Sequence, residues 1–403
     1  MKLFFNFFTV LVLLFSFFSC SKDSSTVEES GSLSLSTLTV FSADGESKSI
    51  RVTSNLNWTA NVDENWISIT PSGGANSESI LVSVDENTTN SDRSGELTVS
   101  GGSLSRVITI EQSANGDNQS SSGLDSNKSP SENFDLSTWN LSIPVNKGDG
   151  TATTITVSQL NNKYENDAYF YTADDGGMVF KCPVDGYKTS TGTSYTRVEL
   201  REMLRGTNTS ISTQGVNKNN WVFGTAPQAD INAAAAFDGE MSATLSVNHV
   251  TTTGDSSQKG RVIVGQIHAN DDEPIRLYYR KLANNTLGSI YFAHEPTDGN
   301  GSEQWHDMIG SRSSSASNPI DGIALDEKFS YTINVVGDAL TVTIIREGKD
   351  DVVKTVDMKN SGFNVSGQYM YFKAGVYNQN NSGDADDYVQ ATFYALEKTH
   401  TTN

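Results

Sequence analysis

The stretch YMYFKAGVYNQ, residues 369–379, decides the fold class of the C-terminal part of this chain. Alternate residues of an extended strand share a face, and the two faces differ in character here. One face would carry Tyr371, Lys373, Gly375, Tyr377 and Gln379, and the other Phe372, Ala374 and Val376. The apolar face predicts burial between two β-sheets. The polar face displays two phenols, an ammonium and an amide, with Gly375 expected to leave room for a ligand.

A second strand is predicted at TRVELREM, residues 196–203. Alternation separates its side chains into two sets: Arg197, Glu199, Arg201 and Met203 on one face, Val198 and Leu200 on the other. Two guanidiniums that flank a carboxylate suit anion recognition, because Arg offers a planar fork and Glu199 can hold both forks in position. A solvent-exposed ladder of salt bridges would give the same pattern, so this segment alone leaves both interpretations open.

A third strand is predicted at RVIVGQIH, residues 261–268, where four apolar or Gly residues lead into Gln266 and His268. These two side chains share a face, while Ile267 points away. A buried amide or imidazole without a partner costs ~1–3 kcal/mol, so both require partners. A lone histidine at such a place would usually be structural.

Composition narrows the class of protein. The chain has 403 residues, long enough for two or three domains, with 33 Gly, 9% aromatic and 19% charged residues. That profile argues against a disordered acidic tail and against a long coiled coil, and it favours many short strands. The formal net charge of −20 argues against a general nucleic-acid binder, so a polyanionic ligand would need a local basic patch.

The N-terminus predicts export. Lys2 precedes an apolar run from Leu3 to Phe18, which ends at a lipobox-like Cys20, so residues 1–19 are predicted to be a lipoprotein signal peptide. The run is short for a membrane-spanning helix, which is the alternative. The following Ser21-Lys22-Asp23 resembles the surface-export tag of Bacteroidetes lipoproteins, which implies lipidation of Cys20 and a place on the cell surface at the outer membrane. The other cysteine, Cys182, is expected to be a buried structural thiol.

The composition also indicates how the mature chain is divided into domains. Residues 20–34 are predicted to be a tether, residues 35–113 an immunoglobulin-like sandwich of seven short strands, and residues 114–130 a Ser/Asn/Gly linker. Residues 131–403 show further strand-length alternation and predict an all-β jelly roll with a concave face that could hold a polymer. Helical pieces there are expected to be short, such as the alanine run at residues 233–236.

The first domain resembles the BACON domain, a Bacteroidetes module attached to carbohydrate enzymes. The resemblance rests on Ser54-Asn55 before Trp58, Trp66-Ile67, Pro71 to Gly74, Arg93-Ser94-Gly95 and the closing Ile110-Glu111-Gln112. Trp58 and Trp66 could stack on sugar rings, but the core of a small sandwich is the favoured place for them.

The second domain resembles the alginate lyases of polysaccharide lyase family 7. The segments RVELREM, QIH and YFKAGVYNQ are similar to that family's three signature segments, and residues 134–141 and 391–397 are similar to its opening and closing strands. The resemblance covers residues 131–400 and implies a jelly roll that cleaves alginate by β-elimination. Val198 stands where the family usually has a small hydroxyl residue, but it points to the opposite face and is expected not to affect the chemistry.

The resemblance also implies roles for the polar residues. Arg197 and Gln266 would neutralise the uronate carboxylate, with His268 beside them, and Tyr377 would protonate the leaving oxygen. From reference pKa values His268 is the better base for guluronate, whereas Tyr377 could serve alone for mannuronate. Lys373 and the arginines are expected to favour the phenolate of Tyr377. Substrate binding and orientation fall to five further residues: Glu199, Arg201, Lys373, Tyr371 and Gln379.

The chemistry requires no cofactor or metal, although the acidic loop at residues 384–387 could hold calcium; a solvated loop is favoured because an EF-hand pattern is lacking. The expected partner is alginate, as polymer or oligosaccharide, bound by a monomer that touches the membrane only through its lipid. A non-catalytic jelly-roll lectin is the alternative function. A retaining glucanase would need two or three carboxylates on one strand, and no such run occurs.

Overall fold

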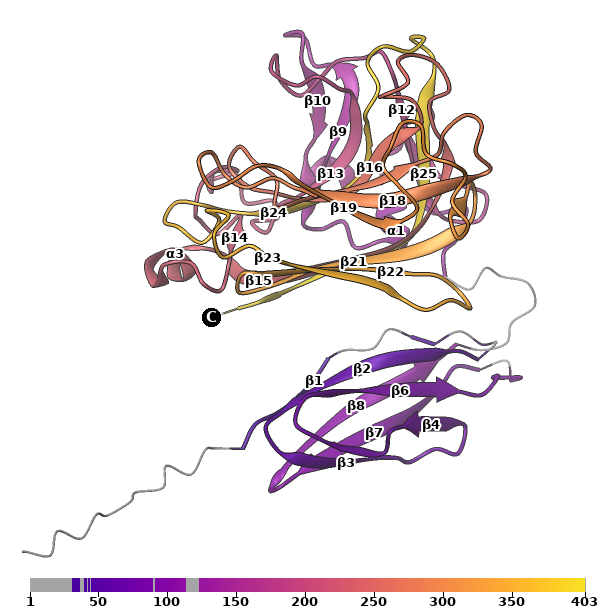
Figure 1. Ribbon diagram of the computed structural model, residues 1–403, viewed down its shortest axis with the longest axis vertical. Coiled ribbons are helices and arrows are strands. Elements are labelled where there is room, and N and C mark those ends of the chain that lie inside the picture. Colours follow the sequence, from indigo (N-terminus) through magenta and orange to yellow (C-terminus); the bar gives the residue numbers. More distant parts are fainter. Residues whose placement is uncertain are drawn as a thin grey trace, which may run out of the picture. The chain divides into compact units, whose positions relative to one another are not determined.

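The computed structural model describes residues 31–36, 40, 41, 43, 45–89, 91–113 and 123–402. The chain forms two compact units that divide between Ser121 and Ser122 (Figure 1). The predicted signal peptide, Cys20 and most of the predicted tether lie outside the described residues. Within the described part of the chain, no helix has the length and apolar character needed to cross a membrane.

The N-terminal unit is a sandwich of two four-stranded sheets within its described residues. One sheet has the order β1 (Leu33–Leu35), β2 (Ser47–Ser54), β6 (Glu78–Val84), β4 (Ile67–Thr70). The other has the order β5 (Gly73–Ala75), β3 (Asn57–Val62), β7 (Arg93–Gly101), β8 (Leu104–Gln112). Trp58 and Trp66 are both buried in the core between these sheets, as the sequence favoured.

Two details of the N-terminal unit differ from the sequence prediction. β1 lies at the end of the segment predicted to be a tether, where Leu33 is buried in the core. One of the seven predicted strands, the run Leu38-Thr39-Val40-Phe41, lies partly outside the described residues, and Phe41 makes an isolated bridge to Gln112. The sandwich therefore begins a few residues earlier than composition indicated.

The described residues of the C-terminal unit form two larger sheets, which confirms the predicted all-β jelly roll. The nine-stranded sheet has the order β10 (Ala152–Ile155), β9 (Trp139–Asn146), β13 (Arg197–Glu202), β24 (Tyr371–Asn378), β16 (Arg261–His268), β17 (Ile275–Arg280), β18 (Leu287–His294), β19 (Gln304–Ile309), with β20 (Ile323–Ala324) beside β18. The eight-stranded sheet has the order β11 (Phe170–Thr172), β12 (Met178–Pro183), β25 (Tyr388–Thr401), β15 (Ala236–His249), β21 (Lys328–Val336), β22 (Ala339–Ile345), β23 (Val352–Asp357), with β14 (Trp221–Val222) beside β15.

The core lies between these two sheets and takes one face of each signature strand. Val198 and Leu200 of β13 are buried in it, together with Phe372, Ala374 and Val376 of β24. These are the apolar residues that alternation predicted to be buried. Burial of each large apolar side chain stabilises the fold by roughly 1.5–3 kcal/mol. The remaining face of the nine-stranded sheet is thereby left for polar residues.

A glycine is needed at position 375 for a different reason from the one predicted. Its φ of +133° suits glycine, and a Cβ atom there would lie 2.6 Å from the Val198 carbonyl oxygen and 3.0 Å from Phe180 Cδ1. The missing side chain lets β24 approach β13 closely. The prediction that Gly375 leaves room for a ligand was wrong.

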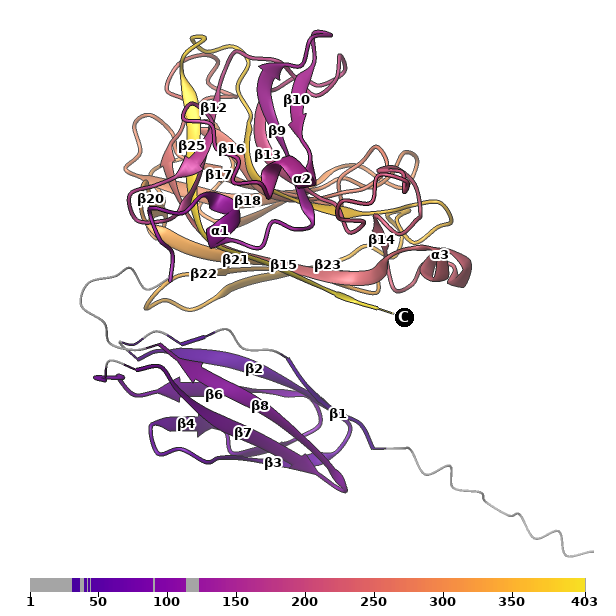
Figure 2. The ribbon, with the colours of Figure 1, turned by 180° about the vertical axis from the view of Figure 1, so that it is seen from behind.

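Three short helices join the strands of the described C-terminal unit: α1 (Pro130–Asn133), α2 (Val157–Leu160) and α3 (Gln228–Ala233), with α1 and α2 labelled in Figure 2. The backbone N–H of Thr156 donates to the Gln159 side chain in a reciprocal capping box that starts α2. The alanine run at residues 233–236 is not itself a helix, since it spans the end of α3 and the start of β15.

The end of the predicted linker belongs to the C-terminal unit. Leu124 is buried in the core of that unit, and the Asn133 side-chain amide donates to the Asp125 carbonyl at 2.9 Å. One apolar residue in a polar segment was too weak a signal to predict this packing.

Candidate active site

The three signature segments become neighbouring strands, β13, β24 and β16, in that order. Antiparallel pairing sets Arg197 opposite Tyr377 and Arg201 opposite Lys373. On the other side of β24, Gln266 pairs with Lys373 and His268 with Tyr371. Residues about 70 to 180 positions apart in the sequence thus meet on one face of one sheet.

Glu199 is the centre of this cluster and is only 2% exposed. Its carboxylate accepts from Arg197 Nη1 at 3.1 Å and also contacts the Lys373 ammonium and the Gln266 amide. Burial alone would raise the pKa of Glu199, but Lys373 and Arg197 outweigh burial and lower it. Burial and the Arg197 charge lower the pKa of Lys373 to about 8.

Arg201 does not share Glu199 with Arg197, so the predicted pair of forks around one carboxylate was wrong. The Arg201 guanidinium lies 3.8 Å from the centre of the Tyr371 ring and donates to the Thr213 carbonyl at 2.7 Å. Lys373 is the second cation on Glu199 instead. This contact joins two strands, so the sequence of a single strand cannot show it.

His268 is held in one orientation. Its Nδ1–H donates to the Ala269 carbonyl at 2.6 Å, and its ring stacks on Tyr371 with centroids 5.1 Å apart. This leaves Nε2 as the basic nitrogen. Burial and the nearby Lys373 charge lower the pKa of His268 to about 3, so the resting imidazole is neutral.

Glu273 is a site residue that sequence reasoning missed. Its Oε1 lies 3.3 Å from His268 Nε2, and its other oxygen lies 3.6 Å from Arg276 Nη1. Burial and Glu295 raise the pKa of Glu273 to about 7 despite the opposing charge of Arg276. Since the resting imidazole is neutral, the contact with His268 is not an ion pair before reaction. The only signal in the sequence was an acidic run just after the QIH segment.

Tyr377 lies beneath Arg197, whose guanidinium carbon is 3.7 Å from the ring centre. Burial raises the pKa of Tyr377, and the Arg197 charge only partly opposes this effect. Arg197 thus favours the phenolate, as expected, but burial of the ring outweighs its effect. The hydroxyl keeps its proton, which is what a proton donor requires.

Three further sequence predictions concern Gln379, Cys182 and the acidic loop at residues 384–387. Gln379 follows the end of β24 and is 5% exposed. Its backbone N–H donates to the Arg261 carbonyl at 3.2 Å, and its carbonyl accepts from Arg261 Nη2 at 3.3 Å. Cys182 is buried in the core, and burial raises the pKa of its thiol to about 12, which agrees with a structural role. In the loop at residues 384–387, Asp387 accepts from two backbone N–H groups at 2.8 and 2.9 Å. Among the residues described, no group of three or more His, Cys, Asp or Glu could hold a metal ion.

Glu202, on the opposite face of β13, belongs to the core and not to the site. Its carboxylate accepts from Trp221 Nε1 at 3.1 Å and lies 3.0 Å from Lys398 Nζ and 2.8 Å from His400 Nε2. Burial would raise the pKa of Glu202, but His400 and Lys398 lower it to about 2. The carboxylates of Glu199 and Glu202, three residues apart, therefore lie on opposite faces of the same strand.

Comparison with known proteins places this site in a family. The alginate lyase family model matches residues 134–400, and the BACON model matches residues 56–113. The chain is 58% identical to an alginate lyase of Klebsiella pneumoniae over 279 residues, which are 67% of this chain and 91% of that protein. The crystal structure of the alginate lyase from Klebsiella pneumoniae has a TM-score of 0.67 at 57% identity and covers 68% of this chain and 98% of that one.

A more distant structure shares the fold. It is the exolytic alginate lyase of polysaccharide lyase family 7 from Zobellia galactanivorans, with a TM-score of 0.51 at 24% identity, covering 68% of this chain and 99% of that one. The resemblances predicted from the three strand segments and from the first domain are thus confirmed, and the lectin alternative is not favoured. The chain belongs to the alginate lyases of polysaccharide lyase family 7 and is an alginate-cleaving lyase that also carries a BACON domain.

Proposed function

We propose that Arg197, Gln266, His268 and Tyr377 carry out the β-elimination of alginate. One observation carries this assignment: three neighbouring strands bring a carboxylate-binding pair, a neutral imidazole and a protonated phenol to one face. The reaction needs each of these groups. It must neutralise the uronate carboxylate, remove the C5 proton and protonate the departing C4 oxygen.

The charge balance of the Glu199 cluster supports binding of the carboxylate. Arg197 and Lys373 bring two positive charges against the single negative charge of Glu199. A uronate carboxylate beside Arg197 and Gln266 would compensate the remaining charge. Donors fixed at that carboxylate gain strength as enediolate charge develops, and removing one commonly costs ~10²–10³ in rate. Glu199 is buried, so its part is to hold these donors in place rather than to contact the sugar.

Proton transfer for guluronate would use both faces of the sugar. The C5 proton passes to His268 Nε2, the electron pair of that C–H bond forms the new double bond, and the C4–O bond breaks as Tyr377 gives its proton to the leaving oxygen. Glu273 lies against the same nitrogen and, when ionised, stabilises the imidazolium that forms. For mannuronate, where the proton and the leaving oxygen share a face, Tyr377 would act from its phenolate. After its own proton passes to solvent, it takes the C5 proton and returns that proton to the leaving oxygen.

A hydroxyl deletion tests this assignment. Tyr377→Phe keeps the ring beneath Arg197 and should lower kcat by ~10² or more, the usual scale for losing a general acid. Tyr371→Phe is the matched control on the same strand face and should cost much less. The assay is ultraviolet absorbance from the conjugated double bond that each cleavage creates. Near-normal kcat with only a raised KM would make Tyr377 a binding residue instead.

We also propose that the mature chain is a monomeric lipoprotein, anchored through Cys20 and displayed at the surface of a Bacteroidetes-type outer membrane. The support is the apolar run at residues 3–18, its lipobox-like end and the acidic tag that follows. A surface anchor suits a polymer that is too large to enter the cell before it is cut.

A further inference from the structure

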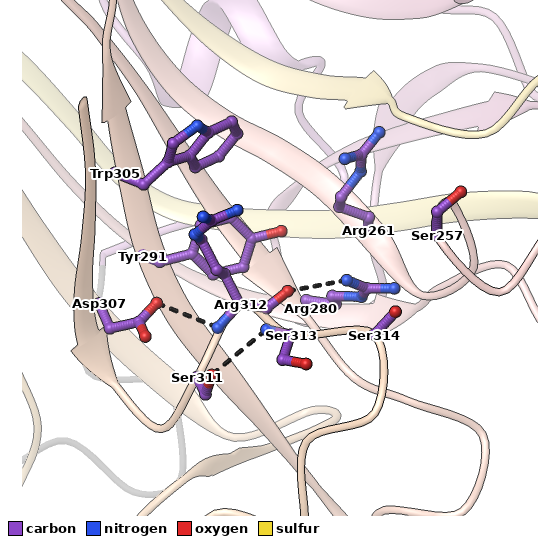
Figure 3. A pocket seen from close by; sticks show the side chains of 10 residues that line it. All are labelled: Ser257, Arg261, Arg280, Tyr291, Trp305, Asp307, Ser311, Arg312, Ser313 and Ser314. Carbon is purple, nitrogen blue, oxygen red and sulfur yellow. Dashed lines mark hydrogen bonds between the residues drawn. The ribbon is translucent and has the colours of Figure 1, made fainter. Parts of the chain in front are cut away.

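The polar face of the nine-stranded sheet continues beyond Tyr377 into a cavity of about 540 Å³. Tyr377 pairs with Ile263 of β16, Ile263 pairs with Tyr278 of β17, and Tyr278 pairs with Tyr291 of β18. These four residues belong to one small apolar cluster, separate from the core between the sheets. Tyr291 also lines the cavity (Figure 3). The cavity and the Tyr377 site therefore lie on the same face of the sheet.

Three guanidiniums line this cavity: Arg261, Arg280 and Arg312. Among residues 123–402, none of them forms a salt bridge. Arg280 is 5% exposed and donates to three backbone carbonyls, including those of Arg312 at 2.9 Å and Ser256 at 2.7 Å. Those carbonyls satisfy its N–H groups but leave its charge uncompensated.

The other two arginines retain free donors. Arg261 donates from Nη2 to the Gln379 carbonyl at 3.3 Å, while its buried Nε has no partner among the described residues. The Arg312 guanidinium lies 4.8 Å from the centre of the Trp305 ring. The one acidic lining residue, Asp307, accepts from the Arg312 backbone N–H at 3.0 Å. In a chain with a formal net charge of −20, this excess of positive charge indicates an anion site.

The cavity also offers flat apolar surface. The Tyr291 ring stacks on Tyr278 with centroids 5.0 Å apart and lies 6.0 Å from the Trp305 ring. Figure 3 shows Trp305 and Tyr291 on one side of the cavity and the Arg261 and Arg280 side chains on the other. A pyranose ring with a carboxylate has both features, an apolar face for the aromatic rings and an anion for the guanidiniums.

From these observations we infer that the cavity is a distal subsite that binds a uronate of the same alginate chain, away from the bond that is cut. The inference rests on the proposed function of the Tyr377 site. Tyr291 and Tyr377 are three strand spacings apart, roughly 14 Å at ~4.8 Å per strand, so the uronate held here is not the one that reacts. The subsite would favour long chains over short ones.

The test replaces Arg312 with Gln, because no described hydrogen bond uses its side chain and the fold should tolerate the change. A hydrogen bond to a charged group contributes ~1.5–3 kcal/mol, so the ratio of kcat/KM on polymer to kcat/KM on trimer should fall ~10-fold or more. Trp305→Ala should lower the same ratio. The matched control is Lys163→Gln, an exposed cation outside the cavity, 68% exposed at its side chain, which should leave the ratio unchanged.

Binding provides a second readout. Calorimetry would compare the Tyr377→Phe variant with the Tyr377→Phe, Arg312→Gln double variant, using alginate oligomers that carry no double bond. The double variant should bind long oligomers more weakly and should bind trimer as before. An unchanged ratio and unchanged binding would overturn the subsite, and so would equal losses on polymer and trimer. Inorganic phosphate that inhibited cleavage of polymer and of trimer equally would also overturn the subsite, because the cavity would then be a general anion site. If the wild type cleaved no alginate at all, the proposed function would fail instead.

Discussion

Replacing Glu273 with Gln would test how the predicted base is tuned, because the change removes one charge and hardly alters size. The Glu273 carboxyl lies 3.3 Å from His268 Nε2 and faces Arg276, Glu295 and Lys373 as well. If His268 accepts the C5 proton, an imidazolium forms against this carboxyl. The variant should therefore impair guluronate cleavage and spare mannuronate cleavage, for which Tyr377 serves as base.

The distance sets the size of the effect. Two unit charges 3.3 Å apart interact by ~5 kcal/mol at an effective dielectric constant of ~20. Both side chains are partly exposed, at 21% for His268 and 17% for Glu273, so solvent screens much of that energy. We expect about 1–2 kcal/mol to remain, which corresponds to a loss of kcat on guluronate blocks of roughly 5- to 30-fold.

The pH profile gives a sharper readout. Burial and Glu295 raise the pKa of Glu273 to about 7, so its carboxyl is neutral below that pH and ionised above it. Only the ionised form favours the imidazolium, so wild-type cleavage of guluronate blocks should rise as pH increases through about 7. The variant should lose this rise.

Initial rates on guluronate-rich and mannuronate-rich blocks, measured across pH, check both expectations. The control is Glu303→Gln, which removes another carboxylate paired with Arg276 without touching His268. A Glu273→Gln variant that kept both the wild-type kcat and the wild-type pH profile on guluronate would refute the reasoning. Equal loss on both kinds of block would also refute it, because the effect would then be structural.

Three further outcomes follow. Glu202→Gln should alter acid stability. The folded pKa of Glu202, about 2, lies below its ordinary value of 4.5, so the stabilisation from its ionised form, about 3 kcal/mol, is present above pH 4.5 and lost as pH falls toward 2. Urea unfolding should show a weaker loss of stability over that range in the variant, and an identical loss would contradict the assignment. A fragment of residues 123–403 should be folded and active, whereas 131–403 should melt at a lower temperature because it lacks Leu124, whose burial contributes roughly 1.5–3 kcal/mol. Cys20→Ala should release the protein from the membrane fraction, and unchanged fractionation would count against lipidation.

Alternation of side chains was sufficient to predict which faces of the signature strands are buried. It works because burial acts on each strand separately, so Val198 and Phe372 could be assigned without knowing their neighbours. Alternation does not predict which side chains of two paired strands come into contact. Glu199 contacts Lys373 rather than Arg201, although the register sets Lys373 opposite Arg201, so the contact runs diagonally between the two strands. No pattern within one strand contains that information.

Burial also explains why the net shift in the pKa of Tyr377 is opposite to the effect of its neighbouring cation. Sequence shows which cations are near in the chain, but not how much water remains around the ring. The Arg197 guanidinium covers Tyr377, so it supplies a favourable charge and at the same time excludes solvent. Desolvation is the larger of the two effects, and the phenol stays protonated.

Glu273 shows the limit of motif reasoning most clearly, because it lies between two strands and not within one. The turn that joins β16 to β17 folds back so that Glu273 reaches His268, five residues before it. The strand fixes where the imidazole points, and the turn fixes what charge faces it. A chain that keeps the strand motif but changes this turn would retain all four proposed catalytic groups and still differ in the basicity of its histidine. On this reasoning, the preference between guluronate and mannuronate depends on the turn after the QIH segment at least as much as on the segment itself.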